Sequence, residues 1–246
     1  MKLTVLLDKL IPLPLRNELR LALGRYPKPL RERYPALAAI GLSRKAVVFD
    51  VGAHSGNFAE TVLAYRPHAH LYAFEPIPDV YATLSARMNR YRNVVVENVA
   101  LGREAGSAEL KVRGFGEASS FLDNGEVLDQ GVYGLDFSTI STISVPIVSV
   151  DAYTIARGLK KIDLLKLDVQ GFELEVLGGA ERMLQAIDWI YTEAQFQELY
   201  RGGPRYDEVF EYLQRRGFKL LQMTAFRADD AGRLMEADML FRRVAP

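Results

Sequence analysis

An apolar run that ends in an acidic residue and enters a glycine turn is the strongest chemical signal in the sequence. The segment VVFDVGAHSG (47–56) sets Asp50 ahead of Gly52 and Gly56, and a helix pattern follows directly. Glycine lets a ligand approach the backbone, and a helix N-terminus at the carboxyl end of a parallel strand attracts anionic groups. The G-x-x-x-G spacing differs from the G-x-G-x-x-G of dinucleotide-binding turns, so a nicotinamide-dependent oxidoreductase fits less well. We therefore expect a small-molecule site at this turn.

A second acidic residue, Glu75, ends the next apolar run, HLYAFE (70–75). A carboxylate at the end of the second strand can accept hydrogen bonds from both hydroxyls of a ribose. Pro76 follows it and breaks the strand. An isolated glutamate at a strand end is more often a solvated charge, but its position after the glycine turn favours a ligand that contains adenosine.

A third polar group consists of Lys166, Asp168 and Gln170, which end a later apolar run. Side chains alternate along a strand, so these three are expected to face the same side. Glu193 ends the run after that one. Such groups can transfer protons. A divalent metal shared by Asp168 and Glu193 has little support, because no histidine lies at ligand spacing from them.

The elements that must position these residues alternate between strand and helix patterns from Lys45 onward, which predicts the α/β class with a parallel sheet. Strands are expected at 46–51, 70–75, 93–101, 107–112, 162–169 and 188–194, helices at 56–65, 78–91, 172–186 and 206–216, and a final antiparallel hairpin at 218–223 and 237–244. The charge of Glu173 is expected to stabilise the N-terminus of the third helix.

Residues 113–145 interrupt this rhythm with repeated glycines among Ser, Asp and Asn. A loop of this length in a compact domain is usually a functional lid or is disordered. Ser119 and Ser120, inside the loop, are candidates to close over a ligand. Phe196 and Tyr200 are spaced as on one face of a helix, where such a pair belongs either to the core or to an acceptor platform.

The composition is that of one globular domain: 246 residues, 31 basic and 31 acidic side chains and no cysteine. The charge balance gives no indication of nucleic-acid binding, and the lack of cysteine excludes disulfides and thiol nucleophiles. No apolar stretch reaches the roughly 20 residues of a membrane-spanning helix. The N-terminus lacks the cleavage site of a secretory signal, so a cytoplasmic location is expected.

Two parts of the chain differ in charge. Residues 1–45 hold ten Lys or Arg and three acidic residues, and prolines break them into short helical pieces, so we expect a basic appendage before a main domain at 46–246. Docking of this appendage on an acidic body is the plainer explanation of its charge. Contact with an anionic acceptor or a membrane surface is the alternative.

These motifs together resemble the FkbM-type methyltransferases. The resemblance rests on DVGAHSG (50–56), AFEP (73–76), NVAL (98–101), the serine pair at 119 and 120, KLDVQGFELEVLGGA (166–180), and the LY and YDEVFEYLQRRGF segments within 199–218. The blocks follow the order of the family and cover roughly residues 46–223. Each block alone is weak, but their combination is specific.

The resemblance implies a Rossmann-like class I methyltransferase fold, with a seven-stranded, mostly parallel sheet and an antiparallel C-terminal hairpin, and S-adenosylmethionine as cofactor. It implies cofactor contacts from Asp50, Gly52, His54, Gly56, Glu75, Pro76, Asn98, Ala100 and Asp168. The implied acceptor is a hydroxyl of a small molecule or a sugar. The family usually has Glu where this chain has Gln170, so a role that needs a carboxylate there does not carry over.

Methyl transfer to a hydroxyl requires an aligned acceptor and the removal of a proton. The candidate catalytic residues are Asp168, which we favour, and Lys166, His54 and Glu193. A binding module that keeps the methyltransferase fold without turnover is the alternative, and a nicotinamide-dependent oxidoreductase is the weaker one. The sequence carries no signal for the identity of the acceptor or for the oligomeric state.

Overall fold

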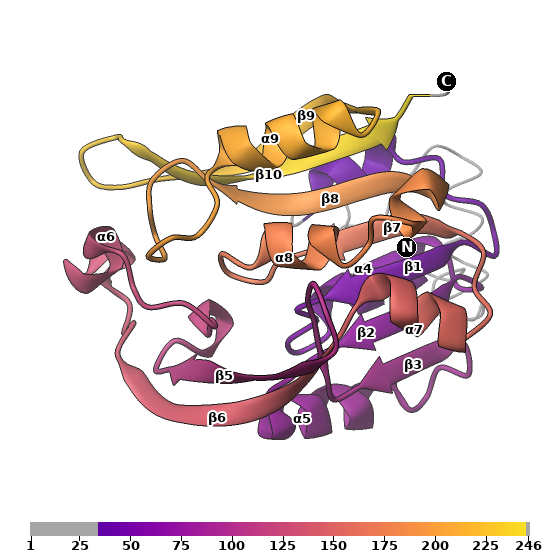
Figure 1. Cartoon of the computed structure of the whole chain (residues 1–246), viewed down its shortest axis with the longest axis horizontal. Helices are drawn as coiled ribbons and strands as arrows, with labels where there is room; N and C mark the ends of the chain where they lie inside the picture. The colour runs from indigo at the N-terminus through magenta and orange to yellow at the C-terminus, as the bar shows by residue number, and fades with distance from the viewer. Residues whose placement is uncertain (1–33, 245–246) are drawn as a thin grey trace, which may run out of the picture.

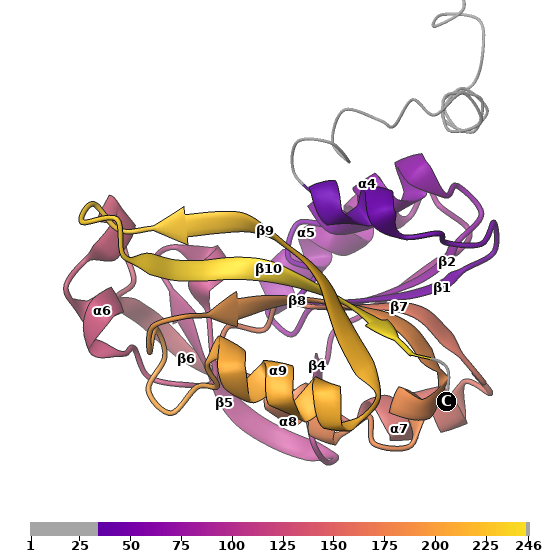
Figure 2. The same cartoon turned by 90° about the horizontal axis from the view of Figure 1, so that it is seen from above.

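The computed structural model describes residues 34–244, which form a seven-stranded sheet with helices on both faces (Figures 1 and 2). The strand order is β3-β2-β1-β7-β8-β10-β9. The parallel strands are β1 (Val47–Val51), β2 (His70–Phe74), β3 (Val94–Glu97), β7 (Ile162–Leu167) and β8 (Ile187–Gln195), and the antiparallel hairpin is β9 (Phe218–Ala228) and β10 (Leu234–Arg243). The expected fold class is confirmed.

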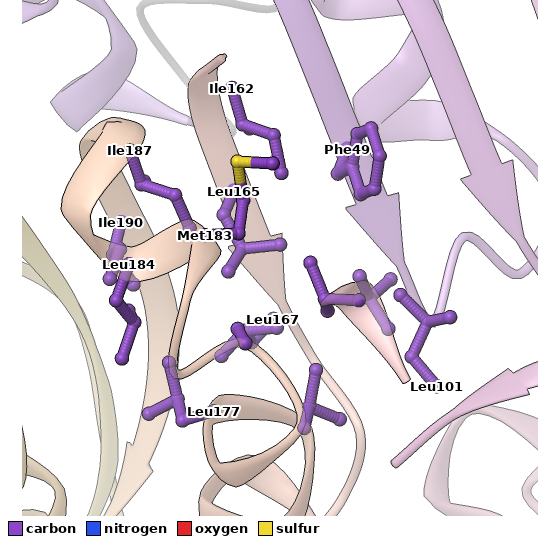
Figure 3. Packing of buried hydrophobic residues seen from close by; sticks show 14 of the residues in the cluster. Phe49, Leu101, Ile162, Leu165, Leu167, Leu177, Met183, Leu184, Ile187 and Ile190 are labelled. Atoms are coloured by element: carbon purple, nitrogen blue, oxygen red, sulfur yellow. The ribbon is translucent and has the colours of Figure 1, made fainter. Parts of the chain in front are cut away.

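Helices cover the two faces of this sheet with separate apolar clusters. On one face lie α4 (Asn57–Tyr65), α5 (Pro78–Met88) and the short 3-10 helix η1 (Pro35–Ala39), and on the other lie α7 (Val150–Ala156), α8 (Glu173–Gly178) and α9 (Tyr206–Arg215) (Figure 2). Figure 3 shows the second cluster, in which Phe49, Leu165 and Leu177 pack between sheet and helices. Both faces being covered explains why the central strands read as continuous apolar runs.

A second sheet was not expected from the sequence. Its order is β4-β6-β5, from β4 (Ala100–Leu101), β5 (Gly106–Arg113) and β6 (Thr139–Val148) (Figures 1 and 2). The expected single strand at 93–101 is therefore wrong. The side chain of Asn98 donates to the carbonyls of Glu75 and Pro76, and the chain leaves the main sheet at this point. β3 and β4 consequently belong to different sheets.

The expected loop at 113–145 is also more ordered than its composition indicates. It contains the start of β6, two 3-10 turns, η2 (Gly116–Ala118) and η3 (Val132–Gly134), and the short helix α6 (Glu126–Asp129). The first part of β6, TISTIS, is mostly exposed and pairs with β5. Because polar residues stand on both of its faces, it lacks the apolar alternation that marks a half-buried strand.

Two expected helices differ in the structure. The helix expected at 172–186 is split into α8 and η4 (Met183–Ala186). At Gly179, which follows α8, the chain passes so close to Gly102 that a Cβ would lie 2.0 Å from the Gly102 carbonyl oxygen. Phe196 and Tyr200 lie on no helix. They follow β8 in irregular structure, where Phe196 stacks on Tyr206 and Tyr200 is buried.

Part of the expected N-terminal appendage belongs to the core. Ala36 and Leu37 of η1 are buried beside α4, and the ring of Tyr34 packs edge-on against Phe58 and Tyr191. Residues 1–33 lie outside the described residues, so the division at residue 45 stays a prediction. None of the helices within 34–244 has the length and apolar character needed to cross a bilayer.

Gly52 provides the first prediction. Its φ is +72°, and a Cβ would lie 1.9 Å from the carbonyl oxygen of Asp168, whereas Gly131 has a similar φ of +77° and open space around it. Gly131→Ala should cost roughly 1–2 kcal/mol for the left-handed backbone alone. Gly52→Ala should cost at least a further ~1–3 kcal/mol, because the added methyl forces the two turns apart. Urea unfolding of both variants measures the difference, and equal losses would contradict the close approach.

Candidate active site

A cavity of about 500 Å³ lies where β1, β2, β7 and β8 end. Ligands in open α/β sheets bind at this edge. Of the residues expected from the sequence, the cavity wall contains Gly52, His54, Glu75, Pro76, Ala100, Lys166, Asp168, Gln170 and Glu193. Its volume falls within the roughly 300–1,000 Å³ typical of small-molecule sites.

The glycine turn forms the floor at the end of β1. The N–H groups of Gly52 and Ala53 donate to the carbonyl of Phe74 at 3.1 and 3.0 Å, which ties the turn to β2. Gly56, with a φ of +84°, packs against α5, where a Cβ would lie 2.7 Å from Leu84. His54 also has a positive φ, of +45°, and its Nδ1 lies 3.7 Å from Glu117 in the segment above. The turn therefore presents backbone, and little side-chain bulk, to the cavity.

Glu75 closes the cavity at the end of β2. Its carboxylate accepts hydrogen bonds from the backbone N–H groups of His54 and Ile77, each at 2.9 Å, and the residue is only 4% exposed. Burial raises the pKa of Glu75 to about 7, because it outweighs the two hydrogen bonds that favour the charged form. Each carboxylate oxygen has a further lone pair for a ligand hydroxyl. Asn98, as described above, fixes the turn that follows Glu75.

A buried ion pair lies beneath the glycine turn. Lys166 Nζ is 3.1 Å from the carboxylate of the fully buried Asp50 and donates to the Gly52 carbonyl oxygen at 2.7 Å. Burial acts to lower the pKa of Lys166, but the charges of Asp50 and Asp168 outweigh it and raise that pKa above its usual value. Asp50 lies behind this ammonium group and not on the cavity wall.

Asp168 and Glu193 meet through the side chain of Gln170. The Gln170 Nε2 donates to Asp168 Oδ1 at 2.7 Å and to Glu193 Oε2 at 2.8 Å, and its Oε1 accepts from the Tyr200 hydroxyl at 2.6 Å. Lys166, Asp168 and Gln170, which were expected on one face of the strand, therefore do converge, since Lys166 Nζ lies 3.5 Å from Asp168. Strand alternation is only part of the cause, because β7 ends at Leu167 and Gln170 has a left-handed φ of +53°.

Three residues of the C-terminal hairpin were not expected at the site. Arg227 forms an ion pair with Glu236 and lies 3.8 Å from Glu193, and Asp238 accepts a hydrogen bond from the Tyr191 hydroxyl. Burial raises the pKa of Asp238 to about 6, and burial together with the Glu236 charge raises that of Glu193. The sequence feature that could have indicated them is the pair Glu236 and Asp238, two positions apart in the mostly apolar strand β10.

A roof formed by residues 113–137 covers the cavity, and Arg113 holds it together. The guanidinium of Arg113 is buried and donates to the Asn124 side chain and to the carbonyls of Ala118 and Leu122, at 2.7–2.9 Å. Burial lowers the pKa of Arg113. No sequence pattern distinguishes this arginine from a surface residue.

Two further contacts of the roof concern the expected serine pair and a tyrosine. Ser119 accepts a hydrogen bond from the Arg113 N–H, and the Ser120 hydroxyl donates to the Gln170 carbonyl at 2.6 Å. Tyr133 has a φ of +67°, and its hydroxyl has no hydrogen-bond partner among the described residues. Ser120 thus joins the roof to the turn after β7, Ser119 makes its contact within the roof, and Tyr133 lines the cavity with an unused donor.

Glu173 lies at a helix N-terminus, as expected. It is the first residue of α8, but it is buried and accepts hydrogen bonds from the N–H groups of Val169 and Gly171. Burial raises its pKa to about 7. Within residues 34–244, no three histidine or acidic side chains are arranged to hold a metal ion.

Three similar proteins are named as methyltransferases. The chain is 31% identical over 160 residues to the 2-O-methyltransferase NoeI of Sinorhizobium fredii, an alignment that covers 63% of this chain and 66% of NoeI. It is 27% identical over 147 residues to the hexuronic acid methyltransferase AglP of Haloferax volcanii, covering 60% and 55%. It is 29% identical over 194 residues to the 31-O-demethyl-FK506 methyltransferase FkbM of Streptomyces tacrolimicus, covering 71% and 73%. The chain thus spans slightly less than two thirds of NoeI and about half of AglP.

Two solved structures share the fold at low identity. The FkbM methyltransferase from Methylobacillus flagellatus has a TM-score of 0.51 and 14% identity, over 83% of this chain and 46% of that one. The precorrin-6y C5,15-methyltransferase from Geobacter metallireducens has a TM-score of 0.50 and 12% identity, over 89% and 93%. The sequence profile of the methyltransferase FkbM domain matches residues 50–220, from Asp50 in β1 to Leu220 in β9. The chain therefore belongs to the FkbM methyltransferase family.

Proposed function

We propose that this chain is an S-adenosylmethionine-dependent O-methyltransferase that acts on a hydroxyl of a small molecule or a sugar. The observation that carries the proposal is that one cavity joins two carboxylates of different character. Glu75 is 4% exposed and backed by two N–H groups, as a ribose acceptor requires, whereas the Asp168 side chain on the wall of the same cavity is 41% exposed.

The cofactor end of the cavity is proposed to be the glycine turn, Glu75 and the apolar residues after β3. The second lone pairs of the Glu75 oxygens suit the two ribose hydroxyls. Ala100, Leu101 and Phe172 line an apolar part of the wall that suits a flat adenine ring. When bound, the cofactor supplies a methyl group on a sulfonium centre, which transfers by in-line displacement.

The reacting end is proposed to lie beside Asp168. The Gln170 amide and the Lys166 ammonium, 3.5 Å away, fix this carboxylate, which can take the proton of an acceptor hydroxyl as that oxygen bonds to the methyl carbon. Lys166 is a poor candidate for the base, because Asp50 and two carbonyl groups hold it in its charged form. Glu193 is the second candidate. His54 lies beside Glu117 of the roof, which favours a packing role.

The relatives support the acceptor class. NoeI and the Streptomyces FkbM are named for methyl transfer to oxygen, and AglP is named for a hexuronic acid. The hydroxyl of Tyr133 and the polar groups of the hairpin supply hydrogen-bonding partners for a polyhydroxylated acceptor. A cytoplasmic location, independence from nucleic acid and the absence of a metal cofactor remain parts of this proposal.

Cofactor class is tested by thermal unfolding of the full chain. S-adenosylhomocysteine should bind at micromolar concentration and, at 100 times its dissociation constant, stabilise the folded state by about 2.7 kcal/mol. NAD at the same concentration should leave the melting temperature unchanged, because the turn lacks dinucleotide glycine spacing. Stabilisation by NAD alone would overturn the assignment.

The role of Glu75 predicts proton release on cofactor binding. Its pKa of about 7 in the folded protein lies above the value of 4.5 for an unfolded chain, so between these pH values Glu75 is protonated in the folded protein without cofactor. The protonated form therefore stabilises the fold below pH 4.5, and this stabilisation is lost as the pH rises through about 7. Ribose hydroxyls donate to the ionised form, so S-adenosylhomocysteine should release protons near pH 6.5 and bind more tightly as pH rises toward 7.

Calorimetric titration in buffers of different ionisation enthalpy measures this release. Glu75→Gln should abolish it and weaken binding by roughly 10- to 100-fold, as expected for a lost hydrogen bond to a charged group. Glu173→Gln is the matched control, because burial raises the pKa of Glu173 similarly but its side chain does not line the cavity. Undiminished release in Glu75→Gln would remove Glu75 from the ribose site.

Asp168 separates turnover from binding. Asp168→Asn keeps the volume but cannot accept a proton, so methyl transfer to an acceptor found by screening hydroxylated sugars and natural products should fall by roughly 10² to 10⁴. S-adenosylhomocysteine affinity should stay within several-fold. Asp230→Asn, on the exposed hairpin turn, is the control. Wild-type turnover by Asp168→Asn would point to Glu193, and cofactor binding without transfer to any acceptor would favour a binding module.

A further inference from the structure

The Gln170 side chain lies between two acidic groups in an orientation that chemistry fixes. In their ionised forms Asp168 and Glu193 only accept hydrogen bonds, which places the nitrogen of the amide toward both of them. The Tyr200 hydroxyl can donate and meets the amide oxygen on the other side. The reverse orientation would set the amide oxygen against both carboxylates. Both N–H groups of the amide are therefore used by the two acids.

The backbone of Gln170 is held at some cost. A left-handed φ of +53° is unfavourable by roughly 1–2 kcal/mol for a residue with a Cβ. The Ser120 hydroxyl donates to the Gln170 carbonyl, and the next residue, Gly171, packs against Tyr200, where a Cβ would lie at 3.1 Å. Contacts from the roof and from the turn thus fix the backbone of Gln170, and with it the position of the amide.

The two carboxylates have a cation on their outer sides and the amide between them. Lys166 approaches Asp168 on its outer side at 3.5 Å, and Arg227 approaches Glu193 at 3.8 Å. Between the two carboxylates the amide NH₂ is the group that bridges them. Two carboxylates that share one bridging group disfavour each other's ionisation, unless hydrogen-bond donors or a cation lie between them.

We propose that Gln170 is a positioning residue, whose amide clamps Asp168 and Glu193 in the place where two acids would otherwise bind a divalent cation. The consequence for catalysis rests on the proposed function: one N–H of the Gln170 amide aims Asp168 at the acceptor while the other holds Glu193, without a divalent metal. The ground for this is the pair of donors directed at the carboxylates, since a cation cannot share that space with two N–H groups.

The proposal predicts that one substitution changes the character of the cluster. Gln170→Glu replaces the two donors by a third carboxylate at a place where the described residues contain no set of three His, Asp or Glu side chains able to hold a metal ion. Oxygen donors of this kind suit Mn²⁺ and Mg²⁺. Without a cation, the three acids repel one another, and with one, they are able to share it.

The experiment measures thermal unfolding and Mn²⁺ binding of the full chain, with no cofactor or acceptor. Gln170→Glu should lower the melting temperature by roughly 5 °C, about 1–2 kcal/mol for a domain of this size. Millimolar Mn²⁺ should restore most of this loss. The wild type and Gln222→Glu, which adds the same charge on an exposed position of β9, should shift by no more than about 1 °C with Mn²⁺.

A second variant keeps the test decisive if Gln170→Glu folds poorly. In Asp168→Asn/Gln170→Glu the amide and the acid exchange places, so the melting temperature should return close to that of Asp168→Asn, and the Mn²⁺ response should be lost. Direct binding of Mn²⁺ to the wild type below 100 μM would overturn the proposal. So would a Gln170→Glu protein as stable as Gln222→Glu and unresponsive to Mn²⁺. Neither outcome depends on cofactor binding, which is measured separately with S-adenosylhomocysteine.

Discussion

The ammonium group of Lys166 joins the two halves of the cavity, and the rest of the site depends on it. It forms an ion pair with Asp50 beneath the glycine turn, donates a hydrogen bond to the Gly52 carbonyl and lies 3.5 Å from Asp168. A buried ammonium needs such partners, because the cost of removing it from water is otherwise several kcal/mol. The turn proposed to hold the cofactor and the carboxylate proposed to take the proton are thus fixed to one point, between neighbouring strands β1 and β7.

The roof stabilises this arrangement from outside the main sheet. β5 and β6 extend from the sheet beside the strand ends (Figure 1), and Arg113, at the end of β5, gathers the carbonyl groups of the segment that follows. Ser120 then connects that segment to Gln170. The geometry at Asp168 and Glu193 therefore depends on a small second sheet that itself supplies neither of them.

The two walls of the cavity differ in the groups that they present. The floor and the β2 end consist of backbone groups, glycines and one carboxylate, an arrangement that suits a constant ligand. The far wall carries Arg227, Glu236 and Asp238 from the hairpin and Tyr133 from the roof. This wall therefore offers charged and hydroxyl groups to the acceptor of the proposed reaction.

The sequence by itself determined the α/β class, the main strands and the residues at their carboxyl ends, because burial of parallel strands and glycine turns leave local patterns. Gly52, Glu75, Lys166, Asp168 and Glu193 could all be found in this way. Only the tertiary structure decided the second sheet, because the first part of β6 is polar on both faces, and the parts played by Arg113, Arg227, Glu236 and Asp238. Which side chains these residues meet depends on long-range packing, antiparallel register and the bulges in β9 and β10, and none of these leaves a local pattern in the chain.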